Sequence, residues 1–383
     1  MEQPLMRAQP MGRPRTGHLE LTALIKFIRP AVICSSLIAT GMMVFMRVTM
    51  IRNTWERTST ISTAETLTAL SVVPGYNESK AQAMLRFSAA AYADNAQTCL
   101  GNLFTGSRYE VFASKSVRCT AGLFLDRNAT CSAYAAVSKS AKRIILAYRG
   151  SMSLSQVRAE FVETLETYAD DMITTGLQVG KYWHVIFRQL EDVFTLVRKK
   201  AGRFADYQIW VTGLSLGAAV ASLASTKLAL IGLNVSLYTF GQPRVGLCEY
   251  ARLHDSLVPD SYRVVHANDL VPHLPPCHVS RTILNPWSSA CSCQGESVIP
   301  KWYHHGTEVF YPADSMELGN YTVCRSAPRD EDSTSRCSDA LYARSWFPWA
   351  RRSTIRNHKS YFGEDVATWC SRLESNATRS AGV

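Results

Sequence analysis

One short segment of this 383-residue chain, residues 213–217 (GLSLG), restricts the fold more than any other. It follows a β-branched and aromatic run at 207–212 that is typical of a buried strand. It precedes residues 216–231, which have the composition of a helix. A G-x-S-x-G motif between a strand and a helix predicts a sharp turn that exposes its serine, here Ser215, at the end of the strand. The alternative is a tight turn with a structural role alone.

The rest of the chain from residue 64 alternates between helical and strand patterns. Strands are expected at 133–137, 143–148, 207–212, 236–240 and 261–265, and helices at 81–93, 154–168, 182–200 and 216–231. This alternation predicts an α/β protein with a mainly parallel sheet flanked by helices. Together with the serine turn, it predicts the α/β-hydrolase fold.

A serine needs a histidine as its base and an acid that orients the histidine, and in this fold the three follow in the order serine, acid, histidine. Asp269 fits the acid, because it comes at the carboxyl end of the expected strand at 261–265. Asp255 and Asp260 come before that strand, where the loops face away from the site. We therefore expect Asp269 to be the acid.

The choice of histidine is less direct. His266 and His273 lie too close to the acid in the chain, and we expect them to be structural. His304 and His305 lie in a short extended stretch, and His358 lies further along the chain. Chemistry alone leaves His358 and the His304–His305 pair nearly level.

Several stretches of the chain resemble the class 3 lipases, a fungal-type family that also has many nematode members. The matching stretches are 148–151 (YRGS), 211–217 (VTGLSLG), 238–246 (YTFGQPRVG), 268–276 (NDLVPHLPP), 303–311 and 357–363 (NHKSYFG). The resemblance spans roughly residues 80–372. It implies an esterase acting on lipid or other esters at a lipid–water interface, with no cofactor and no metal ion.

The resemblance also assigns roles to single residues. It implies that His358 is the base, with His304 and His305 in the site wall or structural, and that the oxyanion is bound by Ser151 and by the backbone N–H of Leu216. The chain departs from the family at two places in the serine turn: Leu214 stands where the family usually has histidine, and Ala218 where it usually has glycine.

Disulfides and a lid are further implications of the resemblance. It suggests a Cys99–Cys370 bridge between the two ends of the domain, and Cys119–Cys131 is a natural local pair. The helix expected at 154–168 follows Ser151 directly, where the family has a lid over the site. Its apolar stripe would face the acyl groove, and the alternative is an ordinary helix packed permanently on the sheet. The stripe consists of Leu154, Val157, Phe161 and Leu165.

The N-terminal region has a different character from the rest of the chain. Residues 1–58 form a basic segment with an apolar helix at about 31–51, and residues 59–383 form the expected catalytic domain. The excess of basic residues before the helix predicts that the remainder of the chain is lumenal or outside the cell. No clear small-x-small cleavage site follows the helix, which favours a signal anchor over a cleaved signal peptide. Ten cysteines beyond the helix and five Asn-x-Ser/Thr sequons also favour the secretory pathway.

Charge and composition weigh against other classes of protein. The net charge of +10 is spread over a large surface, and no basic helix with interleaved aromatic residues appears before the C-terminal region, so nucleic-acid binding is not expected. Two other functions stay open: a catalytically silent relative that binds lipid, and an esterase for soluble or aryl esters. Both would keep the same fold.

Overall fold

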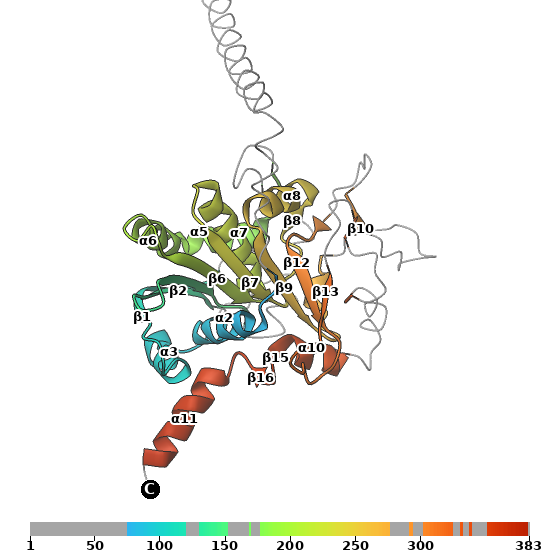
Figure 1. Ribbon diagram of the computed structural model, residues 1–383. Helices are drawn as coiled ribbons and strands as arrows, with labels where there is room; N and C mark the ends of the chain where they lie inside the picture. The colour runs from blue at the N-terminus through green and yellow to red at the C-terminus, as the bar shows by residue number, and fades with distance from the viewer. Residues whose placement is uncertain are drawn as a thin grey trace, which may run out of the picture. The chain divides into compact units, whose positions relative to one another are not determined.

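An eight-stranded sheet runs through the middle of the protein in this computed structural model (Figure 1). Neighbouring strands are parallel from β3 to β12, and the strands at the two edges join antiparallel. In spatial order the strands are β1 (Glu110–Arg118), β2 (Thr130–Ser138), β3 (Arg143–Tyr148), β6 (Gln208–Leu214), β7 (Val235–Phe240), β9 (Asp260–His266), β12 (Thr307–Tyr311) and β13 (Thr322–Cys324). The mainly parallel sheet that the sequence predicts is confirmed.

The structure describes residues 75–119, 130–151, 168–169, 177–275, 291–293, 302–324, 330–331, 337–338 and 351–381. All of them belong to one compact unit, Val73–Val383. The apolar segment at about 31–51 and nearly all of the proposed lid lie outside the described residues. Within the described ranges, no helix combines the length and the apolar character that a membrane crossing requires.

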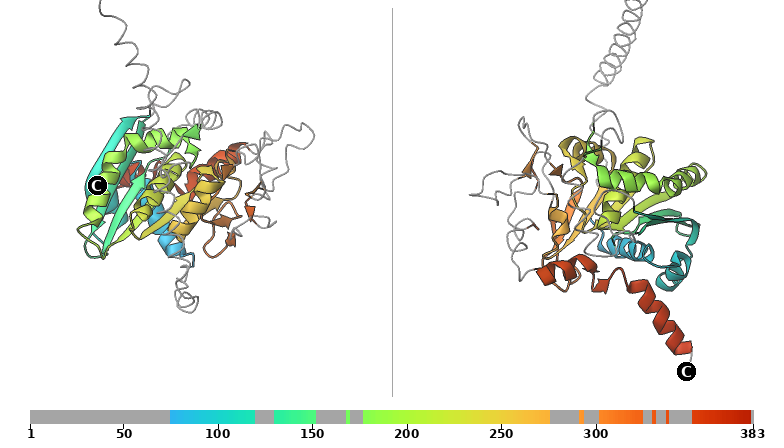
Figure 2. Two further views of the ribbon diagram at one scale, coloured as in Figure 1. Left: turned by 90° about the horizontal axis from the view of Figure 1, so that it is seen from above. Right: turned by 180° about the vertical axis from the view of Figure 1, so that it is seen from behind.

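Helices cover both faces of the sheet (Figures 1 and 2). One face carries α2 (Glu78–Ala90) and α3 (Ala96–Leu103), and α11 (Trp369–Ala381) contacts these two helices near its start and then projects away (Figure 1). The opposite face carries α5 (Lys181–Gln189), α6 (Glu191–Ala201), α7 (Leu216–Leu230) and α8 (Cys248–Leu257). A further helix, α10 (Arg351–Lys359), leads into the short strand β15 (Ser360–Tyr361), which pairs with β16 (Glu364–Asp365).

Short elements complete the fold. A small second sheet contains β4 (Tyr168–Ala169), β5 (Val179–Gly180), β8 (Gly246–Leu247) and β11 (Trp302–Tyr303). A separate pair joins β10 (Cys291–Ser292) to β14 (Asp330–Glu331), and the 3₁₀ turn η1 (Val271–His273) follows β9.

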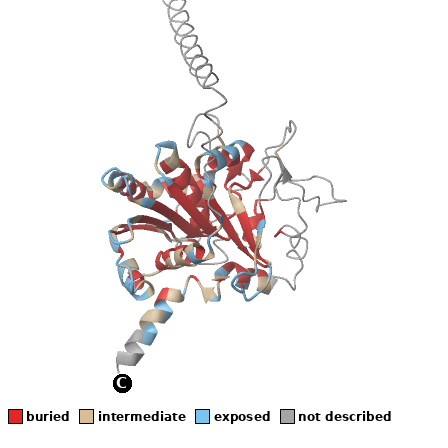
Figure 3. Ribbon diagram, viewed as in Figure 1, coloured by how far each residue is buried: buried red, intermediate tan, exposed pale blue. Residues whose placement is uncertain are grey.

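The central strands divide their side chains between two apolar layers. In β3, Ile144 and Leu146 join the layer under α5, α6 and α7, whereas Ile145 and Ala147 join the layer under α2. Side chains alternate across a strand, so an unbroken apolar run can bury both faces. Figure 3 shows the result: the sheet between the two helical layers is buried throughout its middle.

One expected helix is in fact two. The helix predicted over 182–200 breaks at Leu190, where the backbone leaves helical geometry (φ −101°, ψ 7°). Glu191 and its acidic neighbour then begin α6, a position where the helix dipole favours negative charge. The break lets Phe187 and Phe194 meet edge to face, 5.4 Å apart between ring centroids. The apolar stripe alone did not reveal this bend.

Four disulfides lie among the described residues. They join Cys99 to Cys370, Cys119 to Cys131, Cys248 to Cys293 and Cys324 to Cys337. The first two are the pairs suggested from the sequence. The Cys99–Cys370 bridge ties α11 to α3 across 271 positions of the chain, so it links segments that come early and late in the sequence.

The two predicted disulfides should differ in how much they stabilise the fold. A bridge that closes a longer loop restricts the unfolded chain more, so replacing Cys99 and Cys370 by serine should cost about 3 kcal/mol more than replacing Cys119 and Cys131, whose separation is 12. Thermal and guanidinium unfolding of the two double variants measures the difference. Equal losses would show that loop closure does not govern their contribution.

Candidate active site

Ser215 lies in a strained turn between β6 and α7. Its backbone has φ 58° and ψ −125°, a conformation that L residues rarely adopt, and only 3% of the residue is exposed. Strain of this kind costs about 1–3 kcal/mol and is concentrated at functional sites. The Ser215 N–H donates to the carbonyl of Phe240 at the end of β7, at 3.0 Å, which fixes the turn against the next strand.

The two glycines of the motif allow this turn to form. A Cβ atom on Gly213 would collide with the backbone of Gly217, and a Cβ on Gly217 would collide with the carbonyl of Tyr148 at the end of β3. The chain of the turn therefore passes so close to itself and to β3 that neither position accepts a side chain. This is the local reason for the G-x-S-x-G pattern.

Asp269 follows β9 and is completely buried. Its Oδ1 accepts a hydrogen bond from the Val271 N–H at 3.0 Å, and its Oδ2 accepts one from the Tyr361 hydroxyl at 2.6 Å. The Nδ1 atom of His358 lies 2.9 Å from Oδ1 and 3.0 Å from Oδ2. Three different donors thus converge on one carboxyl group.

These donors keep the carboxyl group ionised. Burial by itself raises the pKa of Asp269, but attraction to His358 and the hydrogen bonds from His358, Tyr361 and Val271 outweigh it and hold the pKa below its usual value. An ionised carboxylate only accepts, so the His358 Nδ1 must carry the hydrogen of their bond. The Nε2 of a neutral His358 ring is then left with a lone pair that can take a proton.

Gly241 brings the serine turn and the acid–histidine pair together. It follows Phe240, whose carbonyl holds Ser215, and it has a positive φ of 52°. A Cβ atom at this position would lie 2.6 Å from Asp269 Oδ2 and 2.8 Å from His358 Nδ1. Because the α-carbon faces the pair directly, this position requires glycine.

The loop after β3 lies against the serine. A Cβ atom on Gly150 would come within 3.2 Å of the Ser215 Cβ, so Ser151 follows a residue in close contact with the turn. The Gly150 N–H donates to the hydroxyl of Tyr92 at 3.1 Å, which holds this loop in place. Leu216 is the first residue of α7, where backbone N–H groups have no partner within the helix. Both residues expected at the oxyanion hole therefore lie beside the turn.

The remaining histidines are held elsewhere. His304 donates from Nε2 to the carbonyl of Pro272 at 2.6 Å. His305 bonds through Nε2 to Ser222 at 2.6 Å and to Gln242 at 3.1 Å, in a buried polar cluster beneath α7 and α8. His266 bonds to backbone carbonyls around α10.

Sequence reasoning did not single out Gly241, Tyr361 or Tyr92. Tyr361 comes three residues after His358, and Gly241 directly follows a strand adjacent to that of the serine, so both spacings contain a usable signal. Tyr92 lies far away in sequence and has no such signal. The two departures at the turn, Leu214 and Ala218, are both buried, and Leu214 packs in the apolar layer that contains Tyr92.

The lid candidates Leu154, Val157, Phe161 and Leu165 lie outside the described residues. Within the part of the chain that the structure describes, Glu308, Cys324 and Cys337 have spacing suited to a metal ion. Their two sulfur atoms are joined in a disulfide, so the group lacks the thiolates that would bind a metal.

The sequence of this chain is similar to those of known lipases. The family described as Lipase (class 3) matches residues 145–279, which contain the serine turn, Ser151 and Asp269. Lipase ZK262.3 of Caenorhabditis elegans is 33% identical over 303 residues, covering 76% of this chain and 80% of that protein. The chain belongs to the class 3 lipase family. It is accordingly a carboxylic ester hydrolase.

Other lipases are similar to this chain in sequence or in fold. The secreted mono- and diacylglycerol lipase 1 of Fusarium solani is 32% identical over 146 residues, covering 38% of this chain and 43% of that protein. A solved triacylglycerol lipase, described as having a serine protease triad at its catalytic centre, aligns with a TM-score of 0.57. It is 24% identical and covers 76% of this chain and 96% of its own, so the likeness establishes the shared fold.

The buried histidines should make this lipase sensitive to acid. His254 bonds to Thr226 at 2.8 Å and to Ser261 at 3.0 Å, and its ring lies against that of His305, tilted by 36° with the centroids 3.6 Å apart. Burial lowers the pKa of His254 from 6.5 to about 3, and burial together with the adjacent His254 lowers the pKa of His305.

As pH falls, these two histidines are protonated in the unfolded chain at a higher pH than in the folded protein. The free energy of unfolding therefore decreases progressively from about pH 6.5 downward. At pH 4.5, His254 alone should cost about 3 kcal/mol.

The variant His254→Gln removes one of these titrating groups. Its melting temperature should fall less steeply than that of the wild type between pH 6.5 and 4.5, whatever its stability at neutral pH. Calorimetry of both proteins across this range makes the comparison. Parallel curves would show that His254 does not contribute to acid unfolding.

Proposed function

We propose that this lipase hydrolyses acylglycerols through a triad of Ser215, His358 and Asp269. The observation that carries the proposal is the buried contact between His358 Nδ1 and Asp269, at 2.9 Å. The pair lies directly against Gly241, which follows Phe240, and the Phe240 carbonyl accepts the hydrogen bond from the Ser215 N–H. This arrangement supplies a nucleophile in a strained turn, a base whose Nε2 has a lone pair, and an acid that fixes the base's tautomer.

The reaction follows from these roles. The Ser215 hydroxyl oxygen attacks the ester carbonyl carbon while His358 Nε2 takes the hydroxyl proton, and Asp269 stabilises the resulting imidazolium. The tetrahedral intermediate places its negative oxygen near the backbone N–H of Leu216 and near Ser151. His358 then gives the proton to the departing alcohol, which leaves an acyl-enzyme. A water molecule, activated by the same histidine, releases the fatty acid and restores Ser215.

The acylglycerol substrate is supported by relatives and neighbours of the same fold. The Fusarium solani relative is a mono- and diacylglycerol lipase, and the solved neighbour is a triacylglycerol lipase. Two alternatives were open from the sequence. The pairing of His358 with Asp269 weighs against a silent lipid-binding protein, because a protein without catalysis has no need of a buried carboxylate held for a histidine. An esterase for soluble esters would use the same residues and is separated by assay alone.

The last residue of the helix expected at 154–168, Tyr168, lies instead in the strand β4, where it pairs with Gly180. We also propose that the helix expected before it is a lid. It follows Ser151 directly in the chain, and its stripe of Leu154, Val157, Phe161 and Leu165 is apolar. Such a stripe would cover an apolar groove in water and face lipid at an interface, so it would avoid water in both states.

The proposed location is the secretory pathway or the cell exterior. The four disulfides and the secreted relative from Fusarium solani support it. Retention of the apolar segment at about 31–51 as an anchor and its removal as a signal peptide both lead to this location. N-terminal sequencing of the mature protein distinguishes the two fates.

Replacing members of the triad tests the mechanism. Ser215→Ala should reduce turnover of a soluble ester by roughly 10⁶-fold while the protein still folds, and His358→Ala should be about as damaging. His304→Ala and His305→Ala should each be milder, because these rings bond to Pro272 and to Ser222 and Gln242 instead. Rates are compared per folded molecule. An active Ser215→Ala variant would end the hydrolase mechanism proposed here, and an active His358→Ala variant with an inactive His305→Ala variant would reassign the base.

A charge on the apolar stripe tests the lid. Phe161→Glu should sharply reduce hydrolysis of an emulsified long-chain triacylglycerol but leave hydrolysis of a soluble short-chain ester and the melting temperature nearly unchanged. Glu163→Gln, on the polar side of the same helix, is the matched control and should change neither substrate's rate. If Phe161→Glu lowers both rates and the melting temperature, the helix is a fixed part of the core, because burial of an unpaired charge is costly.

A further inference from the structure

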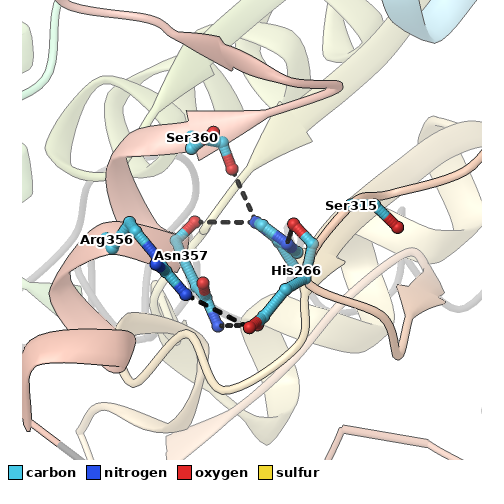
Figure 4. A pocket seen from close by; sticks show the side chains of 6 residues that line it. His266, Ser315, Arg356, Asn357 and Ser360 are labelled. Atoms are coloured by element: carbon cyan, nitrogen blue, oxygen red, sulfur yellow. Dashed lines mark hydrogen bonds and ion pairs between the residues drawn. The ribbon is translucent and has the colours of Figure 1, made fainter.

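His266 connects the parts of the protein that carry the acid and the base. It is the last residue of β9, three positions before Asp269, and only 2% of it is exposed. The Asp269 N–H donates to the carbonyl of His266 at 2.9 Å, so both residues share one tight turn. The His266 side chain points toward α10 and the segment that follows it (Figure 4).

The partners of the His266 ring are all backbone carbonyl groups. Its Nδ1 lies 2.6 Å from the Ser360 oxygen and 3.2 Å from the Asn357 oxygen, and its Nε2 lies 3.1 Å from the Asp314 oxygen. Carbonyl oxygens only accept hydrogen bonds, so a ring nitrogen that bonds to one must carry a hydrogen. Both ring nitrogens therefore donate, Nδ1 to the carbonyls of Ser360 and Asn357 and Nε2 to that of Asp314.

Those two carbonyls lie on either side of the proposed base. Asn357 precedes His358 directly and Ser360 follows it by two positions, at the point where α10 ends and β15 begins. Carbonyl groups in the last turn of a helix have no N–H partner within that helix, so donors from elsewhere must satisfy them. A single buried ring thus holds the chain before and after His358 and attaches both sides to the turn of Asp269.

We propose that His266 is a positioning residue of the hydrolase, which sets the His358 ring at the distance from Asp269 and Ser215 that proton transfer requires. The inference rests on the proposed triad. A misplacement of about 1 Å in a reacting group costs on the order of 10²-fold in rate, so a ring that fixes both ends of the base's segment acts mainly on turnover. Substrate binding is not expected to depend on it.

A residue of the same pocket offers a control that distinguishes positioning of His358 from a general contribution to the local structure. His266, Asp314, Arg356, Asn357 and Ser360 line an open pocket of about 400 Å³, together with Ser315 (Figure 4). At its rim, the exposed Arg356 pairs with the Asp314 carboxylate at 3.1 Å. An exposed ion pair contributes about 0–1 kcal/mol, so Arg356→Ala perturbs the same pocket without moving the base.

The test compares His266→Gln with Arg356→Ala on soluble p-nitrophenyl butyrate, well below the melting temperatures of both. Glutamine offers one donating amide in place of two ring nitrogens, so kcat should fall by about 10–100-fold, with KM within about two-fold of the wild type. Arg356→Ala should retain kcat within about two-fold of the wild type. In ¹H NMR, the low-field signal of the His358 Nδ1 hydrogen should shift or broaden in His266→Gln only.

Two outcomes would overturn the inference: a His266→Gln variant with wild-type kcat, or equal losses of kcat in the two variants. A measurement on the wild type stands even if His266→Gln does not fold. The ¹⁵N shift of His266 Nδ1 should show a bound hydrogen, and a bare Nδ1 would contradict the bonds to Asn357 and Ser360. Ser215→Ala is assayed alongside, because its activity tests the proposed triad and does not depend on the role of His266. Failure of the triad and failure of the His266 inference can therefore be distinguished.

Discussion

The site depends on a close approach of three chain segments at the carboxyl end of β6. The loop after β3, the serine turn and the first residues of α7 lie so near each other that Gly150, Gly213 and Gly217 cannot carry a side chain. Larger residues at these three positions would push the strand and the helix apart and would rotate Ser215. The strained conformation of Ser215 persists because the packed sheet and helix around it leave no alternative.

The site also contains a buried negative charge, the carboxylate of Asp269. Asp269 has no exposure to water, so its ionised form depends on donors from the protein: Val271, Tyr361 and His358. Removing one donor from a buried charge costs more than the bond itself contributes, because the group is then left partly unpaired. In the proposed triad, the donors that stabilise the buried carboxylate would also fix its position beside His358, so stability and catalysis would change together.

Much of the fold was predictable because it follows from local periodicity. The central strands are apolar runs of regular length, and the serine turn has a composition that its geometry demands, so both can be read from neighbouring residues. The break at Leu190 could not, because the helical stripe continues through it and the bend arises from packing between Phe187 and Phe194.

The site divides in the same way. Asp269 was predictable from its place at the end of a strand, whereas chemistry left His358 level with the pair at 304–305, and only resemblance separated them. The contacts of His358 with Asp269 and of His266 with Ser360 join residues 89 and 94 positions apart. No pattern within a single element encodes such pairs, since they depend on how β9 and α10 are brought together.

The position of His358 on α10, beyond the last strand of the sheet, also orders events in time. During synthesis the strands β3, β6, β7 and β9 and the helix α7 all emerge before His358, the proposed base of Ser215. A serine without its base is chemically close to inert. With His358 as its base, as proposed above, the chain would therefore become active only once α10 has docked on the sheet.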